Sequence, residues 1–516
     1  MSKDKIKELV ELRSRLYKGG GDAQIEKMHS QGKYTARERI GMFLDEDTFQ
    51  EDFLMVQHRC NDFGMDKKDL PADGMVTGMG LVDGRSVFVA SQDFTVNAGT
   101  MGEAGARKAQ ELMDAALKTG SPFIFINDSG GARVQEGVSA LSGYGGIFYR
   151  NVLLSGVVPQ ISIIAGPCAG GAAYSPALTD FIIQVQREGQ MYITGPKIIK
   201  EVTGEEVSLE QLGGVDAQAH YSGVVHFVAK SGPEALGLAR RLLSFLPSNN
   251  SEEAPIIEES RNSVIGPDES FNFIVPDDPK VPYDMHEIIW RIVDNADFLE
   301  VQESFAKNII VGFGRLNGRS VGIIANQPAF KAGVLDIDSS DKASRFIRFC
   351  NAFNIPLITL VDVPGFMPGV DQEYGGIIRH GAKLLFAYAS ATVPKFTVII
   401  RKAYGGAYIG MCSKEMGADR VAAWPGAEIA VMGAEGAVSL LYGKEIKNAE
   451  DKAAETKKRL DEYRELFANP YVAAKRGYIH NVILPADTRS YLAASLEMYA
   501  SKRETRPYKK HGLIPL

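Results

Sequence analysis

The sequence predicts an α/β protein made of two similar domains. From about residue 75 onward, short runs rich in β-branched residues alternate with helical stretches and glycine-rich turns. This alternation is typical of βαβ units and a largely parallel sheet, because parallel strands need crossover connections. The chain has 516 residues, which is more than one hydrophobic core usually holds. In addition, the pattern of the first half recurs in the second half.

The elements of the first half follow one another in a clear order. Residues 1–45 are polar and helical in pattern, with a break at Gly19-Gly20-Gly21. The next elements are expected to be strands over 76–82 and 86–91, a helix over 102–117, and strands over 123–128 and 161–165. A polar, acidic stretch over 248–263 contains Pro255 and has no periodic pattern, so it is the expected linker.

The second half repeats the first at a nearly constant spacing. Asp128 and Asp362 each end a β-branched run, and they are 234 residues apart. The turns at Gly84 and Gly318 keep this spacing, and so do the segments VVPQISIIAG and TVPKFTVIIR, within one residue. A repeat of this length is a whole domain rather than a unit of a solenoid. We therefore expect two homologous domains, over residues 1–260 and 261–516.

Composition excludes several classes of protein. Hydrophobic residues make up 45% of the chain and charged residues 23%, as in globular proteins and unlike disordered or fibrous ones. The formal net charge is −7, so the basic face of a nucleic-acid-binding protein is not expected. The apolar runs are strand-sized, and the amino-terminal segment lacks the apolar core of a signal peptide. These features predict a soluble, cytoplasmic protein without membrane insertion.

The four cysteines do not form a metal or disulfide motif. Cys60, Cys168, Cys350 and Cys412 lie far apart, and none belongs to a CxxC pair. A zinc ribbon is therefore excluded and a disulfide framework is not expected. The eight histidines do not cluster at ligand spacings, so we expect no metal in this chain.

The strongest chemical signal is a pair of strand–turn–helix junctions. Gly170-Gly171 follow the strand over 161–165, and Gly405-Gly406 follow the matching strand of the second half. Two glycines let the backbone turn sharply and leave its amides uncovered, and the first N–H groups of a helix have no internal partner. Such amides can hold an oxyanion. Close packing of the helix against the strand also requires glycine, so this alternative stays open.

A second amide donor is expected from another glycine-rich turn in each half. One turn is SGGAR, with Ala132 as the donor, and the other is VPGF, with Phe366 at the matching position. Ligands of open parallel sheets collect at the carboxyl ends of the strands, where both turns are expected. Neither turn fits a dinucleotide-binding or P-loop pattern in the right context.

Side-chain catalysis is poorly supported. There is no GxSxG after a strand and no HExxH. Cys168 lies within the first glycine turn, but the second half has alanine at the matching position, and a free cysteine is commonly a small buried residue. His380 fits a packed helix better than a general base. Asp93, Arg133 and Glu136 either contact a ligand or bond the backbone of their own loops.

These segments resemble a known family. NDSGGARVQEG, GPCAGGAAYSPALTDF, VDVPGFMPG and RKAYGGAY resemble the carboxyltransferase subunits of biotin-dependent acyl-CoA enzymes, and the resemblance spans essentially the whole chain. Similar members are the propionyl-CoA carboxylase β subunit, the methylmalonyl-CoA decarboxylase α subunit and the methylmalonyl-CoA transcarboxylase core. The resemblance implies two crotonase-like domains of the ClpP/crotonase spiral type. Residues 1–260 of one subunit would bind acyl-CoA, and residues 261–516 of another would bind biotin.

The resemblance also implies roles for individual residues. Those implied at the thioester oxygen of acyl-CoA are Ala132, Gly170 and Gly171. Those implied at the ureido oxygen of biotin are Phe366, Gly406 and Ala407. Further implied cofactor contacts are Gly130, Gly131, Arg133, Gly365, Gly405 and Tyr408. The residue after GGAY influences acyl choice in the family, and here it is Ile409. Some propionyl-specific members have aspartate there, so acetyl or broader use stays open.

The resemblance implies cofactors and partners outside this chain. The AMKM-like turn that carries biotin is absent, so biotin is expected on a separate carrier, with a CoA thioester as substrate. The implied partners are a biotin carboxyl carrier protein, a biotin carboxylase subunit or a membrane decarboxylase subunit, and further copies of this chain in a homohexamer. Three directions stay open: ATP-driven carboxylase, sodium-pump decarboxylase and transcarboxylase. The rivals from other classes are a non-catalytic scaffold and a crotonase-type hydrolase or hydratase, which would need a carboxylate pair.

Overall fold

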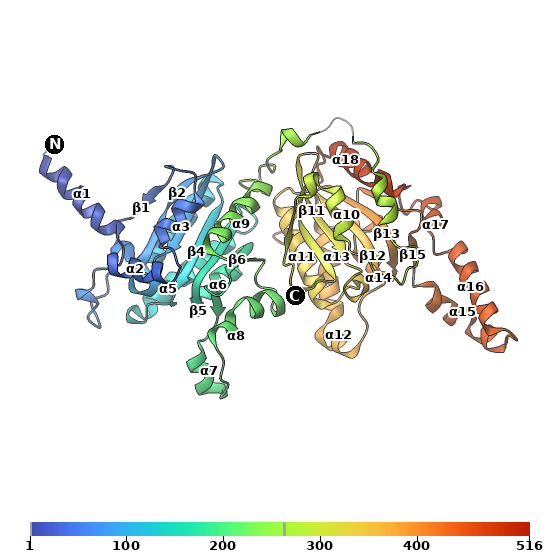
Figure 1. Ribbon diagram of the computed structural model, residues 1–516, viewed down its shortest axis with the longest axis horizontal. Helices are drawn as coiled ribbons and strands as arrows, with labels where there is room; N and C mark the ends of the chain where they lie inside the picture. Colours follow the sequence, from blue (N-terminus) through green and yellow to red (C-terminus); the bar gives the residue numbers. More distant parts are fainter. Residues whose placement is uncertain (1–2, 262–264) are drawn as a thin grey trace. The chain divides into compact units, whose positions relative to one another are not determined.

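The chain folds into two compact α/β units (Figure 1). The computed structural model describes residues 3–261 and 265–516, so residues 262–264 of the expected linker lie outside the described residues. The units are Met1–Glu253 and Ala254–Leu516, and the division lies a few residues before the expected boundary between 260 and 261. The described part of each unit contains one eight-stranded sheet. The predicted class, α/β with two homologous domains, is confirmed.

The sheet of the first unit is mainly parallel. Its strand order is β1–β2–β3–β4–β5–β6–β8, with β7 beside β5. β2 pairs with β1 and β3 in antiparallel fashion, and the other pairs are parallel. The strand bounds are β1 Gln50–Asp52, β2 Met75–Val82, β3 Arg85–Gln92, β4 Phe123–Ser129, β5 Gln160–Ala169, β6 Phe181–Val185, β7 Gln190–Tyr192 and β8 Phe227–Ala229.

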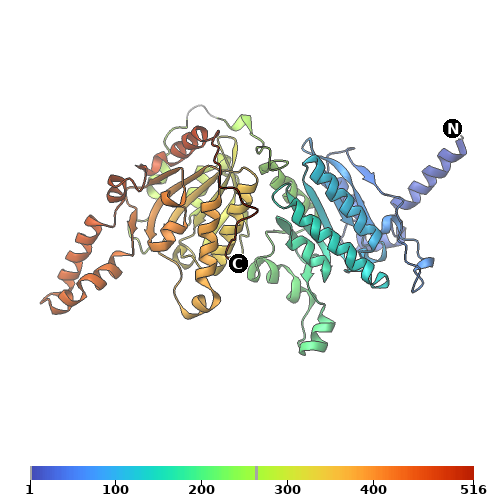
Figure 2. The ribbon, with the colours of Figure 1, turned by 180° about the vertical axis from the view of Figure 1, so that it is seen from behind.

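Helices cover both faces of this sheet. Figure 1 shows α3 and α9 on one face, and the opposite view in Figure 2 shows α4 and α5 across the other. In α4, Ala106, Ala109, Met113 and Ala116 are buried, which is the spacing of one helix face packed on a core. The helix bounds are α1 Lys3–Tyr17, α2 Asp22–Ser30, α3 Ala36–Phe43, α4 Glu103–Thr119, α5 Val138–Leu154, α6 Gly171–Ala177, α7 Pro196–Thr203, α8 Leu209–Gly213 and α9 Gly232–Phe245.

The second unit repeats this topology. Its strand order is β16–β14–β13–β12–β11–β10–β9, with β15 beside β13. The antiparallel pair β10–β11 matches β2–β3, and the parallel strands β12 and β13 match β4 and β5. The strand bounds are β9 Phe298–Val301, β10 Ile309–Leu316, β11 Arg319–Asn326, β12 Leu357–Val363, β13 Lys395–Tyr404, β14 Arg420–Ala423, β15 Glu428–Ala430 and β16 Asn481–Val482.

The helices of the second unit include a hairpin beside the sheet. Between β15 and β16 in the chain, α15 and α16 form a helical hairpin that extends away from the sheet (Figure 1). No helix within residues 3–261 and 265–516 is both long and apolar enough to cross a membrane. The helix bounds are α10 His286–Ile292, α11 Ile337–Ala352, α12 Val370–Gly375, α13 Ile377–Ser390, α14 Gly405–Gly410, α15 Ala434–Asn448, α16 Lys452–Leu466, α17 Pro470–Lys475 and α18 Thr488–Met498.

Candidate functional site

Each unit has a glycine turn where a parallel strand meets a short helix. β5 leads into α6 through Gly170, and β13 leads into α14 through Gly405. The two glycines have φ angles of 60° and 58°, in the left-handed region that glycine adopts without a steric penalty. Conformation therefore explains the first glycine of each pair.

The second glycine of each pair has another reason. A Cβ atom at Gly406 would have no heavy atom within 4 Å, and a Cβ at Gly171 would lie 3.4 Å from the ring of Tyr144, an ordinary contact. Neither position has a positive φ. Packing and conformation thus do not require glycine at these two positions. Gly406 is exposed, and a side chain at this position would meet open space.

The second amide turn of the first unit is held by an isolated bridge between Met101 and Ala132. The Met101 N–H donates to the Gly131 carbonyl at 2.9 Å, and the Arg133 N–H donates to the Met101 carbonyl at 2.9 Å. Because the neighbours of Ala132 make both bonds of this parallel bridge, its own N–H points to the other side. Within the described residues this N–H has no hydrogen-bond partner.

The second unit builds the same arrangement around Phe366. Leu335 and Phe366 form an isolated parallel bridge. The Leu335 N–H donates to the Gly365 carbonyl at 3.1 Å, and the Met367 N–H donates to the Leu335 carbonyl at 2.7 Å. The N–H of Phe366 is again turned away from the bridge, and the part of the chain that the structure describes offers it no acceptor.

The two turns adjoin each other within each unit. In the first unit a Cβ at Gly131 would lie 3.1 Å from the carbonyl oxygen of Ala169, the last residue of β5. In the second unit the Phe366 ring lies 3.6 Å from the Cβ position of Gly410 in α14. Each unit therefore brings both of its predicted amide donors to the carboxyl end of the same strand pair, β4–β5 in one case and β12–β13 in the other.

Arg133 has protein partners rather than an open position. It is fully buried and forms ion pairs with Asp73 and with Glu136, the latter at 2.7 Å. It also donates to the Thr100 carbonyl at 2.9 Å. These contacts fix the turn that contains Ala132. A direct contact of Arg133 with a cofactor stays a prediction.

The residues after Gly406 combine a buried hydroxyl with an exposed apolar side chain. The Tyr408 hydroxyl is buried and has no hydrogen-bond partner within residues 3–261 and 265–516. Burial, with the nearby Glu415 charge, raises the pKa of Tyr408 to about 12, so the hydroxyl stays protonated and can donate a hydrogen bond. Ile409 is 43% exposed. Ala407 is buried, and its carbonyl accepts from the Met411 N–H at 2.9 Å.

The side chains that could replace amide chemistry are occupied. Cys168 is fully buried, burial raises the pKa of its thiol, and the thiol donates to the Ala172 carbonyl at 3.0 Å. In α13, Nδ1 of His380 lies 2.8 Å from Asp341. These contacts support the sequence interpretation that the cysteine is structural and that the histidine is packed.

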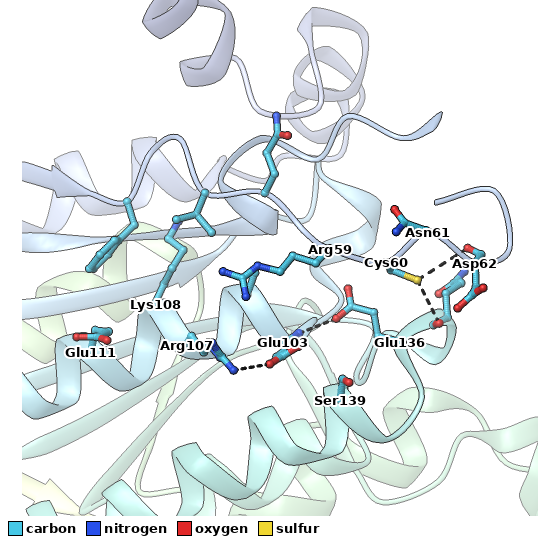
Figure 3. A pocket seen from close by; sticks show the side chains of 15 residues that line it. Arg59, Cys60, Asn61, Asp62, Glu103, Arg107, Lys108, Glu111, Glu136 and Ser139 are labelled. Atoms are coloured by element: carbon cyan, nitrogen blue, oxygen red, sulfur yellow. Dashed lines mark hydrogen bonds and ion pairs between the residues drawn. The ribbon is translucent and has the colours of Figure 1, made fainter. Parts of the chain in front are cut away.

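Two cavities lie near the amide turn of the first unit. Figure 3 shows a cavity of about 520 Å³ between residues 53–62 and α4, into which Arg59 points and where Arg107 pairs with Glu103 at 2.6 Å. A second cavity, of about 490 Å³, is lined by Lys27 of α2 and by the loop that contains Ala98. The Ala98 carbonyl accepts from the Gly130 N–H at 3.0 Å, so the second cavity adjoins the turn of Ala132.

Comparison with known proteins gives consistent matches over the whole chain. A family model described as the carboxyl transferase domain matches residues 27–514. The 12S subunit of methylmalonyl-CoA carboxyltransferase from Propionibacterium freudenreichii subsp. shermanii is 56% identical over 511 residues, covering 99% of this chain and 97% of that protein. Methylmalonyl-CoA decarboxylase subunit alpha from Propionigenium modestum is 57% identical over 513 residues, covering 99% of both.

A solved structure agrees with these matches. The crystal structure of transcarboxylase 12S, described as a hexamer with methylmalonyl-coenzyme A and methylmalonic acid bound, superposes with a TM-score of 0.97 at 56% identity. The match covers 100% of this chain and 99% of that chain. The resemblance drawn from the sequence motifs is therefore confirmed. With this match from end to end, and with the paired amide turns in both units, the chain belongs to the carboxyl transferase domain family.

Proposed function

We propose that this protein transfers a carboxyl group between biotin on a partner protein and the α-carbon of a short acyl-CoA, with propionyl-CoA and methylmalonyl-CoA as the acyl pair. The observation that carries the proposal is the pair of matching turns around Ala132 and Phe366, whose N–H groups have no acceptor within the described residues. Carboxyl transfer creates an oxyanion on each of two reactants, and fixed amides stabilise such charges well. The relatives' names, which refer to methylmalonyl-CoA, support the acyl class.

Each unit is assigned one reactant. In the first unit the amides of Ala132 and Gly171 hold the thioester oxygen while the α-carbon carries the enolate charge. The Gly170 N–H donates to the Tyr192 carbonyl at 2.9 Å, so the role that the resemblance implies for its amide is not assigned here. In the second unit the amides of Phe366, Gly406 and Ala407 hold the ureido oxygen. Biotin supplies a nitrogen that carries the carboxyl group. The Phe366 N–H and the Tyr408 hydroxyl, which both lack a hydrogen-bond partner within the described residues, fit a polar ligand there.

The nucleotide end of CoA is assigned to the cavity lined by Lys27. This cavity adjoins the Ala132 turn through the bond between Gly130 and Ala98. Lys27 is exposed, and its ammonium group makes no ion pair within the described residues. A free lysine ammonium at a cavity wall is a suitable partner for a phosphate group. The adjoining loop then places the thioester end of the same molecule beside Ala132.

The subunit arrangement follows from the homology of the two half-sites. The transcarboxylase 12S structure is described as a hexamer and as the core of a multienzyme complex. We assign the same homohexamer to this chain, with a biotin carboxyl carrier protein as partner. We assign the same two amide turns to the decarboxylase direction, to which the name of the relative from Propionigenium modestum refers. Identifying the biotinylated protein that copurifies with this chain would distinguish the carboxylase, decarboxylase and transcarboxylase directions.

The test of the proposed function uses the purified protein with methylmalonyl-CoA and free biotin. The expected result is formation of propionyl-CoA that depends on both the protein and biotin. Omission of biotin is the control for simple hydrolysis or decarboxylation. Formation of free methylmalonic acid and CoA at the same rate with and without biotin would instead show a crotonase-type hydrolase. Tight binding of methylmalonyl-CoA with no turnover would show a scaffold.

A further inference from the structure

A buried aspartate precedes the amide turn of each unit. Asp128 lies near the end of β4 and Asp362 near the end of β12, and each is 1% exposed. The strand ladders change register at these positions: the β4–β5 ladder between residues 127 and 129, and the β12–β13 ladder between residues 361 and 363. The regular backbone pairing is disrupted at such an irregularity. The aspartate side chain therefore determines how the two strands are joined there.

In the first unit the carboxylate is joined to β5 through Arg39. The Arg39 Nη1 lies 2.9 Å from Oδ2 of Asp128, and its Nη2 donates to the carbonyl of Ala165 in β5 at 3.1 Å. A Cβ atom at Gly166 would lie 1.9 Å from Oδ1 of Asp128. The carboxylate thus packs directly on the backbone of β5, a few residues before Gly171.

In the second unit the carboxylate reaches β13 without an intermediary. Oδ1 of Asp362 accepts from the backbone N–H of Lys402 at 3.1 Å, and Oδ2 accepts from Nε of Arg401 at 2.9 Å. Arg401 is itself held by the Val281 carbonyl at 2.9 Å and lies over the ring of Tyr283. Asp362 therefore joins the end of β12 to β13 a few residues before Gly406.

The two arginines come from different elements. Arg39 belongs to α3, whereas Arg401 belongs to β13 itself. The position in the first unit that matches Arg401 is Gly166, where the carboxylate leaves no room for a side chain. Inheritance of one ancestral pair would have placed both arginines at matching positions. Instead, each of the two matching aspartates pairs with an arginine from a different element: Asp128 with Arg39 of α3, and Asp362 with Arg401 of β13.

Stability alone explains these pairs poorly. Replacing a buried ion pair with apolar residues of similar volume is often neutral or stabilising, because taking two charges out of water is expensive. Both pairs lie at matching places in the fold. Asp128 and Arg39 join β4, which leads to Ala132, to β5, which leads to Gly171. Asp362 and Arg401 join β12, which leads to Phe366, to β13, which leads to Gly406. The two pairs also share a further restraint, because the backbone N–H of each aspartate donates to a side-chain oxygen of β3 or β11.

We propose that Asp128 with Arg39, and Asp362 with Arg401, are positioning residues that set the spacing between the two amide donors of their own half-site. The pair in the first unit positions Ala132 against Gly171, and the pair in the second positions Phe366 against Gly406. The inference rests on the proposed function, because the amide donors matter only if an oxyanion binds between them. A misplacement of about 1 Å can cost on the order of 100-fold in rate.

The test compares Asp128→Asn and Asp362→Asn in the full-length protein. Two readouts are used: carboxyl transfer from methylmalonyl-CoA to free biotin, and binding of a CoA thioether that ends in a nitronate, which mimics an enolate. Both variants should lose on the order of 100-fold in kcat for transfer. Only Asp128→Asn should weaken the binding of the nitronate analogue relative to the binding of propionyl-CoA. Asp362→Asn should leave that affinity ratio unchanged and keep the KM for methylmalonyl-CoA.

Folding is controlled with a second pair of variants. Arg39→Lys and Arg401→Lys keep the charge but lose the fork that joins two acceptors, and they should show the same pattern with smaller losses. Thermal unfolding and oligomer size are measured for all four. An unchanged nitronate ratio in a folded Asp128→Asn protein overturns the proposal, and so does loss of folding in all four variants, which would make the pairs structural only. Absence of transfer in the unmodified protein overturns the proposed function instead. The affinity of the nitronate relative to propionyl-CoA can still be compared between the unmodified protein and Asp128→Asn, so the role of Asp128 is tested separately.

Discussion

Gly170 and Gly405 have nearly the same φ angle, 60° and 58°, at the same step of the duplicated fold. Each lies where a parallel strand leads into a short helix, and the N–H of the next residue, Gly171 or Gly406, has no acceptor within the described residues. The first glycine is required by its backbone angle, whereas the second has room for a side chain. Two residues that look alike in the motif therefore have different roles, and substitutions can separate them.

Gly405→Ala should destabilise the protein, whereas Gly406→Ala should not. An alanine at 405 would hold a left-handed φ, which costs roughly 1–2 kcal/mol, and its Cβ would lie 3.0 Å from the Val431 carbonyl oxygen. The same change at 406 meets open space. Urea unfolding of both variants measures the difference. Equal unfolding free energies would show that the conformational argument is wrong.

Lys27→Ala should raise the KM for acyl-CoA and leave kcat unchanged. The lysine lines the cavity assigned to the nucleotide end of CoA, away from the reacting carbon. Losing one charge-assisted contact of about 1.5–3 kcal/mol corresponds to roughly a 10- to 100-fold higher KM. Lys18→Ala, outside this cavity, is the matched control. A KM for propionyl-CoA that stays the same in both variants would place the nucleotide elsewhere.

Ile409→Asp should shift acyl preference toward propionyl-CoA. Ile409 is 43% exposed on the helix that carries the Gly406 amide, and the family resemblance implies that some propionyl-specific members have aspartate at this position. One methylene in a pocket is worth about 1–3 kcal/mol, so the ratio of kcat/KM for propionyl-CoA over acetyl-CoA should rise about 10-fold. Ile409→Val is the control. An unchanged ratio in the aspartate variant argues against a role of this position in acyl choice.

The stability of the second unit should depend on the charge of His286. Its ring nitrogens lie 2.7 Å from Asp284 and 2.7 Å from Glu300. Burial lowers the pKa of His286, but the bonds and charges of these two carboxylates outweigh it and raise the pKa to about 9. The contribution is complete below about pH 6.5, the unfolded pKa, and is lost as pH rises through about 9. His286→Gln should flatten the unfolding free energy between these pH values, whereas an unchanged profile would rule out this pair of contacts as its source.

The sequence alone indicates the amide donors because the duplication presents each of them twice. Ala132 and Phe366 are identified by one spacing and one turn chemistry, and both are found in the same kind of bridge. The pair of Arg39 and Asp128 could not be predicted, because 89 residues separate its partners and no motif joins them. Such contacts depend on how α3 packs on the sheet, which local patterns do not encode.

Arg133 illustrates a second limit. Its place in a glycine turn favours ligand contact, but the fold surrounds its guanidinium with Asp73, Glu136 and the Thr100 carbonyl. A charged residue that contacts a ligand and a charged residue that supports the loop are of the same residue types, so the sequence does not distinguish them. Only the three-dimensional arrangement shows which carboxylates are close enough to pair.

The central claim is that backbone amides, rather than side chains, carry out the transfer, and the Gly406 N–H tests it most directly. Gly406→Pro removes this N–H, and Gly406→Ala keeps it in a position with open space. The measurement is the rate of carboxyl transfer from methylmalonyl-CoA to free biotin, with folding and CoA binding shown to be intact. We predict near-normal transfer for alanine and a loss on the order of 100- to 1000-fold for proline. Equal rates in the two folded variants would contradict the account.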